Sequence, residues 1–185
     1  KAICSTGKSS NPHSALQILS AYLTESGVVL AQETIHEKSN EIPAFQQMLT
    51  YLDVHGKTVT ADAMHCQRRT SEEIVARKGN YVFGLKENQP SLLADVRMYF
   101  EDTDDGDSFN TFQTIEKNAG RIEKRLCRKA RDIAWLAAHK WPGLRSVFAV
   151  ERIVDVRGIL SKETSYYISS SDVSARELLG AVREH

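Results

Sequence analysis

The sequence predicts an α/β protein in which a mixed β-sheet is flanked by helices and the second half of the chain is rich in strands. Two short apolar runs, residues 57–61 and 81–85, enclose a segment with helical character. Strands this apolar favour parallel pairing with helices on both faces of the sheet. Ahead of them, residues 15–35 hold two strand-like runs around a short turn, which predicts a hairpin. Beyond residue 104, four strand-like segments alternate with turn residues.

The first elements follow from turn residues and from apolar spacing. Residues 1–14 contain Gly, Pro and several Ser, and predict a loop. The hairpin strands are expected at 15–23 and 28–35, around a turn at 24–27. Ser39 is placed to cap a helix with Pro43 in its first turn. The apolar positions of that helix recur at three and four residues: Ile42, Phe45, Met48, Leu49 and Leu52.

A strand–helix–strand–helix run is expected after Gly56. The strand at 57–61 ends shortly before Asp62. The following helix covers about residues 68–78, turns Ile74 and Val75 inward, and ends at Gly79. The strand at 81–85 has the aromatic and β-branched content of a buried strand. Pro90 then opens a helix that continues to the aromatic pair Tyr99 and Phe100.

The second half of the chain predicts four strands, one short helix and a final helix. The strands are expected at 109–115, 122–127, 147–156 and 165–170. Gly120, the Trp141-Pro142-Gly143 turn and Gly158 punctuate them. A short helix is expected over 132–139. Ser174 or Asp172 caps the last helix, whose apolar face holds Leu178, Leu179 and Val182.

Composition points to a globular domain and excludes some classes of protein. The chain has 185 residues, of which 41% are apolar and 26% charged, enough for one domain with a full core. No apolar run approaches the roughly 20 residues of a membrane span. Cys4, Cys66 and Cys127 are few, odd in number and widely spaced. They argue against a disulfide framework or a zinc site and favour a reducing cytoplasm.

Charge is balanced overall but unevenly distributed. The chain carries 24 basic and 24 acidic residues, and this balance alone does not indicate a nucleic-acid partner. Residues 101–107 form an acidic run that predicts a solvated loop. A basic run occupies 121–131: Arg121, Lys124, Arg125, Arg128, Lys129 and Arg131. The basic run predicts either a phosphate-tracking face or the polar side of a surface element.

The candidate chemistry lies where strands end. Asp62 follows a strand and offers either a metal-binding carboxylate or a turn cap. One carboxylate cannot by itself complete a magnesium site. His65 could contact a substrate or water, or sit at the start of the next helix. Lys86 follows the strand at 81–85, at the edge where ligands gather in open α/β sheets, and could meet a phosphate or be an ordinary exposed lysine.

Several blocks of this sequence occur in the same order in a known family. The main blocks are Ala15–Tyr22, Glu37–Ile42, Thr60–Gln67 and Tyr81–Gln89, and shorter ones follow at 120–123, 141–144 and 166–170. On these blocks, which cover nearly the whole chain, the sequence resembles the DDE transposases of bacterial insertion sequences, in the group that contains the H-repeat-associated proteins. Besides Asp62, Lys38 and Lys86, the matching motif positions are Asn40, Glu41, Gln67, Asn88 and Gln89.

The resemblance implies a ribonuclease-H-like fold and three acids, Asp, Asp and Glu. In such sites the acids hold two Mg²⁺ or Mn²⁺ ions about 3.5–4 Å apart, which activate a water or a 3′-hydroxyl for attack on a DNA phosphate. Asp62 matches the second acid. Lys1 aligns with the Lys of an Asp-Gly-Lys motif, so the first acid is expected two residues before it. The third acid is expected four positions after His185, and Glu184 is not that residue.

The resemblance also implies domain limits, partners and DNA contacts. The expected segments are a core at 1–103, a β-rich insertion at 104–164, and a return to the core at 165–185. The implied partners are double-stranded DNA, as terminal repeats and target, and a second copy assembled on DNA in the bacterial cytoplasm, with no membrane. The candidate DNA contacts are Lys38, Lys86, Arg121, Arg125 and Arg128. Because two metal ligands fall outside 1–185, this piece is expected to be inactive and metal-free by itself.

Two other functions stay open on the sequence. A decayed or domesticated core would keep DNA or protein contacts without chemistry. A ribonuclease-H-like nuclease or resolvase would cleave DNA without strand transfer. His65 stands where relatives of the family often have Gly. The residues that flank 1–185 would separate the enzyme from the binding module, because they would carry the other two acids.

Overall fold

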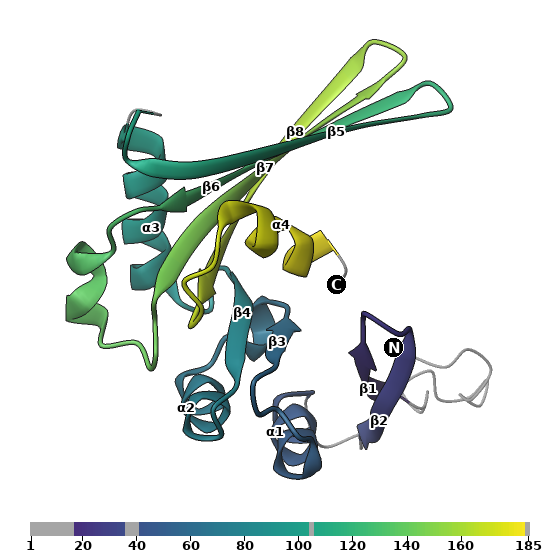
Figure 1. The fold of residues 1–185 in the computed structure, drawn as a ribbon, viewed down its shortest axis with the longest axis vertical. Coiled ribbons are helices and arrows are strands. Elements are labelled where there is room, and N and C mark those ends of the chain that lie inside the picture. Colours follow the sequence, from purple (N-terminus) through teal and green to yellow (C-terminus); the bar gives the residue numbers. More distant parts are fainter. Residues whose placement is uncertain (1–16, 36–40, 104–105, 184–185) are drawn as a thin grey trace, which may run out of the picture. The chain divides into compact units, whose positions relative to one another are not determined.

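The computed structural model describes residues 17–35, 41–103 and 106–183. The chain divides into two compact units, residues 1–55 and residues 56–185. Figure 1 shows the elements of both units in sequence colours. Each unit is described by itself.

An antiparallel hairpin forms the first part of unit 1. Its strands are β1 (Gln17–Leu23) and β2 (Val28–Ile35), which pair as a two-stranded sheet. Gly27 has a φ of +70°, a conformation that glycine adopts without steric cost, and its N–H donates to the Leu23 carbonyl at 2.9 Å. The predicted hairpin is confirmed, although residues 15 and 16 of the expected first strand lie outside the described residues.

Helix α1 (Glu41–Tyr51) completes unit 1. It buries Met48 and Leu49, as their helical spacing predicts. At its last turn, the Tyr51 hydroxyl donates to Glu33 Oε1 of β2 at 2.7 Å. This hydrogen bond raises the pKa of Tyr51. The expected cap, Ser39, lies outside the described residues, as do two of the motif positions, Lys38 and Asn40.

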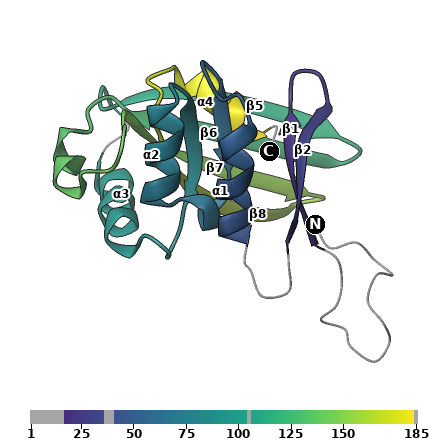
Figure 2. The ribbon, with the colours of Figure 1, turned by 90° about the horizontal axis from the view of Figure 1, so that it is seen from below.

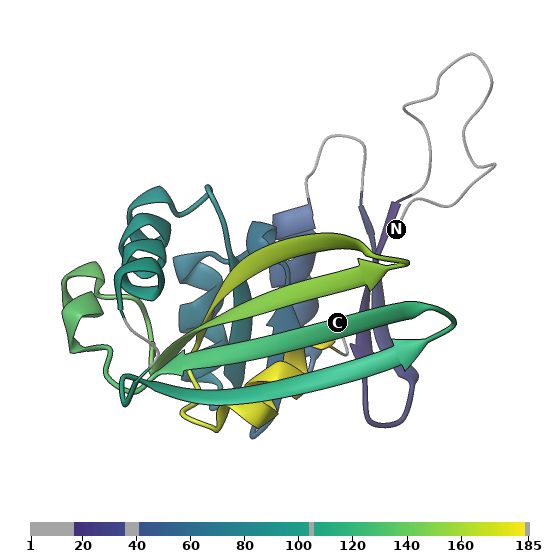
Figure 3. The same cartoon turned by 90° about the horizontal axis from the view of Figure 1, so that it is seen from above.

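A six-stranded mixed sheet is the centre of unit 2. Its spatial order is β3-β4-β8-β7-β6-β5, with β3 parallel to β4 and every other neighbouring pair antiparallel. The strands are β3 (Thr58–Ala61), β4 (Asn80–Leu85), β5 (Phe109–Asn118), β6 (Arg121–Ala130), β7 (Ser146–Val156) and β8 (Ile159–Ser169). Figure 3 shows the two long hairpins, β5–β6 and β7–β8, lying side by side. The mixed α/β architecture predicted from the sequence is present.

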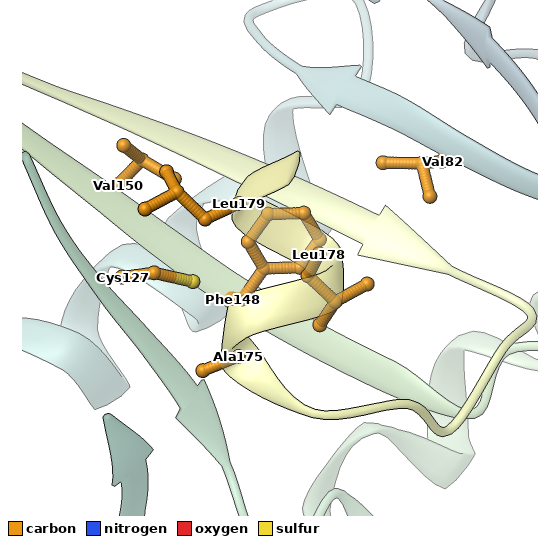
Figure 4. Close-up of a cluster of buried hydrophobic side chains, with 7 residues drawn as sticks. All are labelled: Val82, Cys127, Phe148, Val150, Ala175, Leu178 and Leu179. Atoms are coloured by element: carbon orange, nitrogen blue, oxygen red, sulfur yellow. The ribbon is translucent and has the colours of Figure 1, made fainter. Parts of the chain in front are cut away.

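Helices cover both faces of this sheet. On one face, α4 (Ala175–Arg183) packs Leu178 and Leu179 against a buried cluster from the strands. Figure 4 shows that cluster, which also contains Val82, Cys127, Phe148, Val150 and Ala175. The apolar face predicted for the last helix is therefore confirmed. Of the two expected caps, Ser174 is the one used, because its hydroxyl and N–H both bond the Glu177 carboxylate in a capping box.

The opposite face carries α2 (Arg68–Ala76) and α3 (Pro90–Asp102), which Figure 2 shows in front of the strands. The Phe100 ring of α3 stacks on Phe109 of β5 with centroids 5.2 Å apart. Trp141 Nε1 donates to Ser71 Oγ of α2 at 3.1 Å. Aromatic rings thus fill the space between these helices and the sheet.

The end of α2 differs from the expectation in two details. Lys78, and not Gly79, takes the left-handed conformation, with a φ of +59°. Its N–H and that of Gly79 bond the carbonyls of Val75 and Ile74, both at 2.9 Å, which is a Schellman motif. Ile74 is fully buried, but Val75 is 36% exposed. The expectation for Val75 was wrong because one residue along a helix rotates the side chain by about 100° away from the buried face.

Other expected elements are displaced or longer. The short helix expected over 132–139 is a 3₁₀ helix, η3 (Ala134–His139). Glu101 and Asp102 of the acidic run belong to the last turn of α3, and not to a loop. Strand β5 runs three residues past its predicted end and β8 begins six residues before its predicted start, because these hairpin tips are exposed and lack the apolar pattern. Within residues 17–35, 41–103 and 106–183, no helix combines the length and apolar character of a membrane span.

The sheet runs without a break across the segment limits expected from the sequence. Strand β8 spans residues 159–169 and pairs with β7 on one side and β4 on the other. The segments 1–103, 104–164 and 165–185 stay predictions. In the structure, the β-rich stretch and the βαβ unit share one sheet.

Candidate functional site

Asp62 lies at the junction between β3 and the 3₁₀ helix η2 (Ala63–His65). Its backbone is extended, with φ −71° and ψ 176°, and its Oδ1 accepts the N–H of Met64 at 3.1 Å. This is an N-cap, so the turn interpretation made from the sequence describes its local role. The side chain is exposed to solvent. A solvated cap carboxylate with a second oxygen outside the cap bond is available to a ligand.

A hollow of about 600 Å³ opens beside Asp62, outside the carboxyl ends of the parallel strands β3 and β4. Asp62 and Lys86 line it together, as the parallel pairing of their strands predicts. Arg97 of α3 and Glu163 of β8 add charged side chains, and Val182 comes from the last turns of α4. The carboxylate therefore shares one open site with the C-terminal helix.

This hollow does not contain a complete metal site within the described residues. Among those residues no three His, Cys, Asp or Glu side chains gather as metal ligands. Glu87 and Glu163 line the hollow but make no such cluster with Asp62. A hard divalent cation needs several oxygen ligands. Asp62 therefore cannot form such a site by itself.

Three carboxamides hold the turn that follows Asp62. Asn88 Nδ2 donates to the Ala63 carbonyl at 2.6 Å, and Gln89 Nε2 donates to the Cys66 carbonyl at 3.0 Å. Gln67 Nε2 donates to the Met64 carbonyl at 3.2 Å. These motif residues, singled out from the sequence with no role assigned, therefore meet around one turn.

The predicted basic run does not form one face. Alternate residues of a strand point to opposite faces, so Arg121 and Arg125 share the α4 side of β6 while Arg128 lies on the other side. On the α4 side, the buried carboxylate of Glu123 bonds Arg121 at 2.6 Å and Arg152 at 2.8 Å, and also pairs with Arg125. The Arg152 hydrogen bond, with Arg121 and Arg125, lowers the pKa of Glu123 to about 2. Two of the three predicted DNA-binding arginines are thus engaged with an internal acid.

Arg128 occupies a different setting on the α3 side. Its guanidinium lies 5.3 Å from the Phe109 ring centroid and 5.7 Å from that of Phe100. It lines a second hollow of about 610 Å³. Arg97, Thr164 and Tyr166 line both this hollow and the one beside Asp62. The two hollows therefore adjoin, and Arg97 lies where they meet.

The remaining candidate residues have structural settings. His65 is 5% exposed. Cys66 and Cys127 are buried, and burial raises the pKa of each thiol to about 12, which removes their thiolate reactivity at neutral pH. Lys129 pairs with Asp172. Glu41 stands in the first turn of α1, where a carboxylate favours the positive helix end.

Comparison with known proteins identifies the family. A family model for the transposase DDE domain matches residues 3–184. This chain belongs to the DDE transposase family. With that assignment, the resemblance seen in the sequence and the ribonuclease-H-like mixed-sheet fold class are both confirmed.

Individual relatives agree with the family assignment. The chain is 36% identical over 157 residues to an uncharacterized protein in the dhlA 3′ region of Xanthobacter autotrophicus, which covers 84% of this chain and 53% of that protein. It is 31% identical over 182 residues to the "H repeat-associated putative transposase YhhI" of Escherichia coli K12, covering 92% of this chain and 47% of the relative. The chain thus spans about half the length of the curated relatives it matches. No solved structure matches it.

Arg97, Glu123 and Glu163 are the residues that sequence reasoning missed. Glu123 stands between two basic residues of the run, and a strand period of two places it beside Arg121 and Arg125. That signal was available in the sequence. Glu163 carries no local signal, because only the pairing of β8 with β4 brings it to the hollow. Arg97 reaches the hollow from α3, whose packing the local sequence does not give.

Proposed function

We propose that this chain is the catalytic-domain portion of a transposase that cuts and joins DNA at the ends of an insertion sequence, with Asp62 as one metal-holding acid. The observation that carries the proposal is the position of Asp62. Its carboxylate is exposed at the carboxyl end of β3, in a hollow that Val182 of the C-terminal helix also lines. The segment that would carry a third acid after α4 would therefore begin beside this hollow.

Asp62 would hold a divalent cation together with acids outside residues 1–185. When bound, Mg²⁺ or Mn²⁺ makes a water or 3′-hydroxyl nucleophilic and stabilises the charge that develops on the DNA phosphate. Asp62 contributes one oxygen from a backbone that is fixed by its cap bond to Met64. Lys86 and Arg97, on the rim of the same hollow, contribute positive charge that attracts and orients the phosphate. Taken alone, residues 1–185 are proposed to be inactive.

The proposed DNA path follows the side of the sheet that carries α3. Lys86, Arg97 and Arg128 lie along the two adjoining hollows. Phosphate contacts from such residues would supply affinity without sequence preference. Arg121 and Arg125 would contribute less, because Glu123 already neutralises part of their charge. Terminal repeats, target DNA and a second copy of the protein are the proposed partners, in the bacterial cytoplasm.

The test is a strand-joining assay with the full-length protein, Mg²⁺ and DNA that carries the element ends. Asp62→Asn keeps the shape of the cap and removes the charge. Asp132→Asn is the matched control, because Asp132 is also exposed and its Oδ1 accepts the N–H of Ala134 at 2.9 Å. Asp62→Asn is expected to lose both cleavage and joining, and Asp132→Asn to keep both.

Each alternative function gives its own result in this assay. Cleaved DNA without joined product would indicate a nuclease or resolvase. DNA binding by the wild-type protein without any cleaved product would indicate a binding module. Equal activity of Asp62→Asn and the wild-type protein would contradict the role proposed for Asp62.

A further inference from the structure

We propose that Gln67, Asn88 and Gln89 are positioning residues, whose side-chain amides hold the Asp62 carboxylate in the direction that metal binding requires. This inference rests on the proposed function, since it takes Asp62 to be a metal ligand. It gives a role to three motif positions that otherwise have none. Their amides bond the backbone of the turn that follows Asp62, so they act on the carboxylate through that turn.

The three amides converge on one turn of backbone. Residues 63–66 connect β3 to α2 through η2, and the carbonyls of Ala63 and Cys66 accept from side chains of the loop that follows β4. Asn88 bonds the Ala63 carbonyl at 2.6 Å and approaches that of Cys66 at 3.4 Å. Gln89 bonds the Cys66 carbonyl at 3.0 Å. Both ends of the turn are therefore tied to the loop beyond the neighbouring parallel strand.

Gln67 fixes the middle of the same turn. Its Nε2 donates to the Met64 carbonyl at 3.2 Å, while the N–H of Met64 donates to Asp62 Oδ1 at 3.1 Å. The peptide groups on either side of Met64 are thus held by Gln67 and by Asp62 itself. A shift of Met64 would move the N–H that bonds Asp62 Oδ1, and the Asp62 carboxylate would move with it.

Close packing below the turn limits its alternatives. Ala63 and Cys66 are buried, and buried carbonyls need donors. A Cβ atom on Gly84 of β4 would come within 3.2 Å of the Ala63 nitrogen, so the strand and the turn are already in contact. Without the amides, the Cys66 carbonyl loses its donors Asn88 and Gln89, and the Ala63 carbonyl keeps the N–H of Cys66 at 3.1 Å but loses Asn88, so the turn can shift.

This displacement would reach the site chemistry. A misplacement of about 1 Å at a reacting centre costs on the order of 100-fold in rate. Loss of an amide should therefore weaken metal binding and turnover together. A purely structural role would lower the amount of folded protein and leave the metal dependence of the folded fraction unchanged.

The experiment measures the half-saturating Mn²⁺ concentration in the full-length protein, by Mn²⁺ electron paramagnetic resonance titration and by strand joining. Asn88→Ala removes one donor. Gln89→Met removes another and keeps an unbranched side chain of similar length, so folding is retained. Gln113→Ala is the control, because Gln113 is an exposed carboxamide on β5, at the opposite edge of the sheet from β3.

Asn88→Ala and Gln89→Met are expected to raise the half-saturating Mn²⁺ concentration at least about tenfold and to reduce joining by about 100-fold at low metal. Excess Mn²⁺ should recover part of the joining. Gln113→Ala should match the wild-type protein. Unchanged Mn²⁺ titrations for folded Asn88→Ala and Gln89→Met would overturn the positioning role while Asp62→Asn stays inactive. Full activity of Asp62→Asn would instead remove the proposed function itself.

Discussion

Asp62 and Glu123 are two carboxylates of the same sheet with opposite settings. Asp62 is exposed beside an open hollow and accepts one backbone N–H. Glu123 is 8% exposed and is surrounded by Arg121, Arg125 and Arg152. Its pKa is lowered to about 2, chiefly by the Arg152 hydrogen bond.

The difference separates a carboxylate that serves the fold from one that can serve a ligand. The oxygens of Glu123 are occupied by guanidinium groups of β6 and β7, so they are not available to a ligand. Asp62 gives one oxygen to a local cap and presents the other side of the group to the hollow. Strong internal pairing therefore does not mark a functional acid in this protein.

The largest effect expected from this comparison concerns stability. Glu123→Ala leaves three arginines near one another without their shared counter-charge. This change should lower the free energy of unfolding by about 3 kcal/mol. The value is at the lower end of the range for a broken buried ion pair, because Arg121 and Arg152 are partly exposed to solvent. Asp62→Ala loses only an exposed cap bond and should cost about 1 kcal/mol. Urea unfolding of both variants measures the difference. Equal losses of unfolding free energy in the two variants would contradict the structural difference proposed between Glu123 and Asp62.

A smaller effect concerns the pH dependence of stability. The folded-state pKa of Glu123 lies near 2, below its ordinary value of 4.5, so its stabilisation is present above pH 4.5 and is lost as the pH falls toward 2. Glu123→Gln should therefore show a shallower loss of stability than the wild-type protein between pH 4.5 and 2. The lowered pKa values of Asp172 and Glu177 contribute to both proteins and cancel in the comparison.

Urea unfolding at several pH values measures the free energy of unfolding of the wild-type protein and of Glu123→Gln. Gln113→Ala, which removes no titratable group, is the control and should follow the wild-type slope. A Glu123→Gln curve parallel to the wild-type curve would mean that the arginine cluster does not hold Glu123 in its charged form.

The smallest effect expected concerns DNA affinity on the two sides of the sheet. Arg128→Gln should reduce the slope of log affinity against log salt by about 1, the value of one lost phosphate contact. The double change Arg121→Gln and Arg125→Gln should reduce it less, because these arginines already pair with Glu123. Binding isotherms between low and moderate salt test this. A larger loss from the double change would move the DNA path to the α4 side.

Local pattern was sufficient to predict most of the fold. The spacing of Leu178 and Leu179 predicted the buried face of the last helix, and the apolar runs at 57–61 and 81–85 predicted the parallel pair. Errors arose where one residue decides the geometry. Val75 lies one step beyond the buried face of its helix, and Lys78 takes a left-handed conformation that the sequence assigned to Gly79.

The site was less predictable because it is made by long-range pairing. Asp62 and Lys86 could be placed together from the parallel strands that precede them. Glu163 joins them only because β8 pairs with β4, and Arg97 joins them from α3. The basic run misled because a count of charges ignores the alternation of a strand, which separates Arg128 from Arg121 and Arg125.

The most direct test of the central claim is a metal-specificity switch at Asp62 in the full-length protein. Asp62→Cys replaces a carboxylate with a thiolate, which binds the softer Mn²⁺ better than Mg²⁺. If Asp62 holds the metal, strand joining by Asp62→Cys should be lost with Mg²⁺ and partly restored with Mn²⁺, while Asp132→Cys joins DNA with either ion. Equal joining by Asp62→Cys with both ions, at the wild-type level, would contradict the claim that this carboxylate binds the catalytic metal.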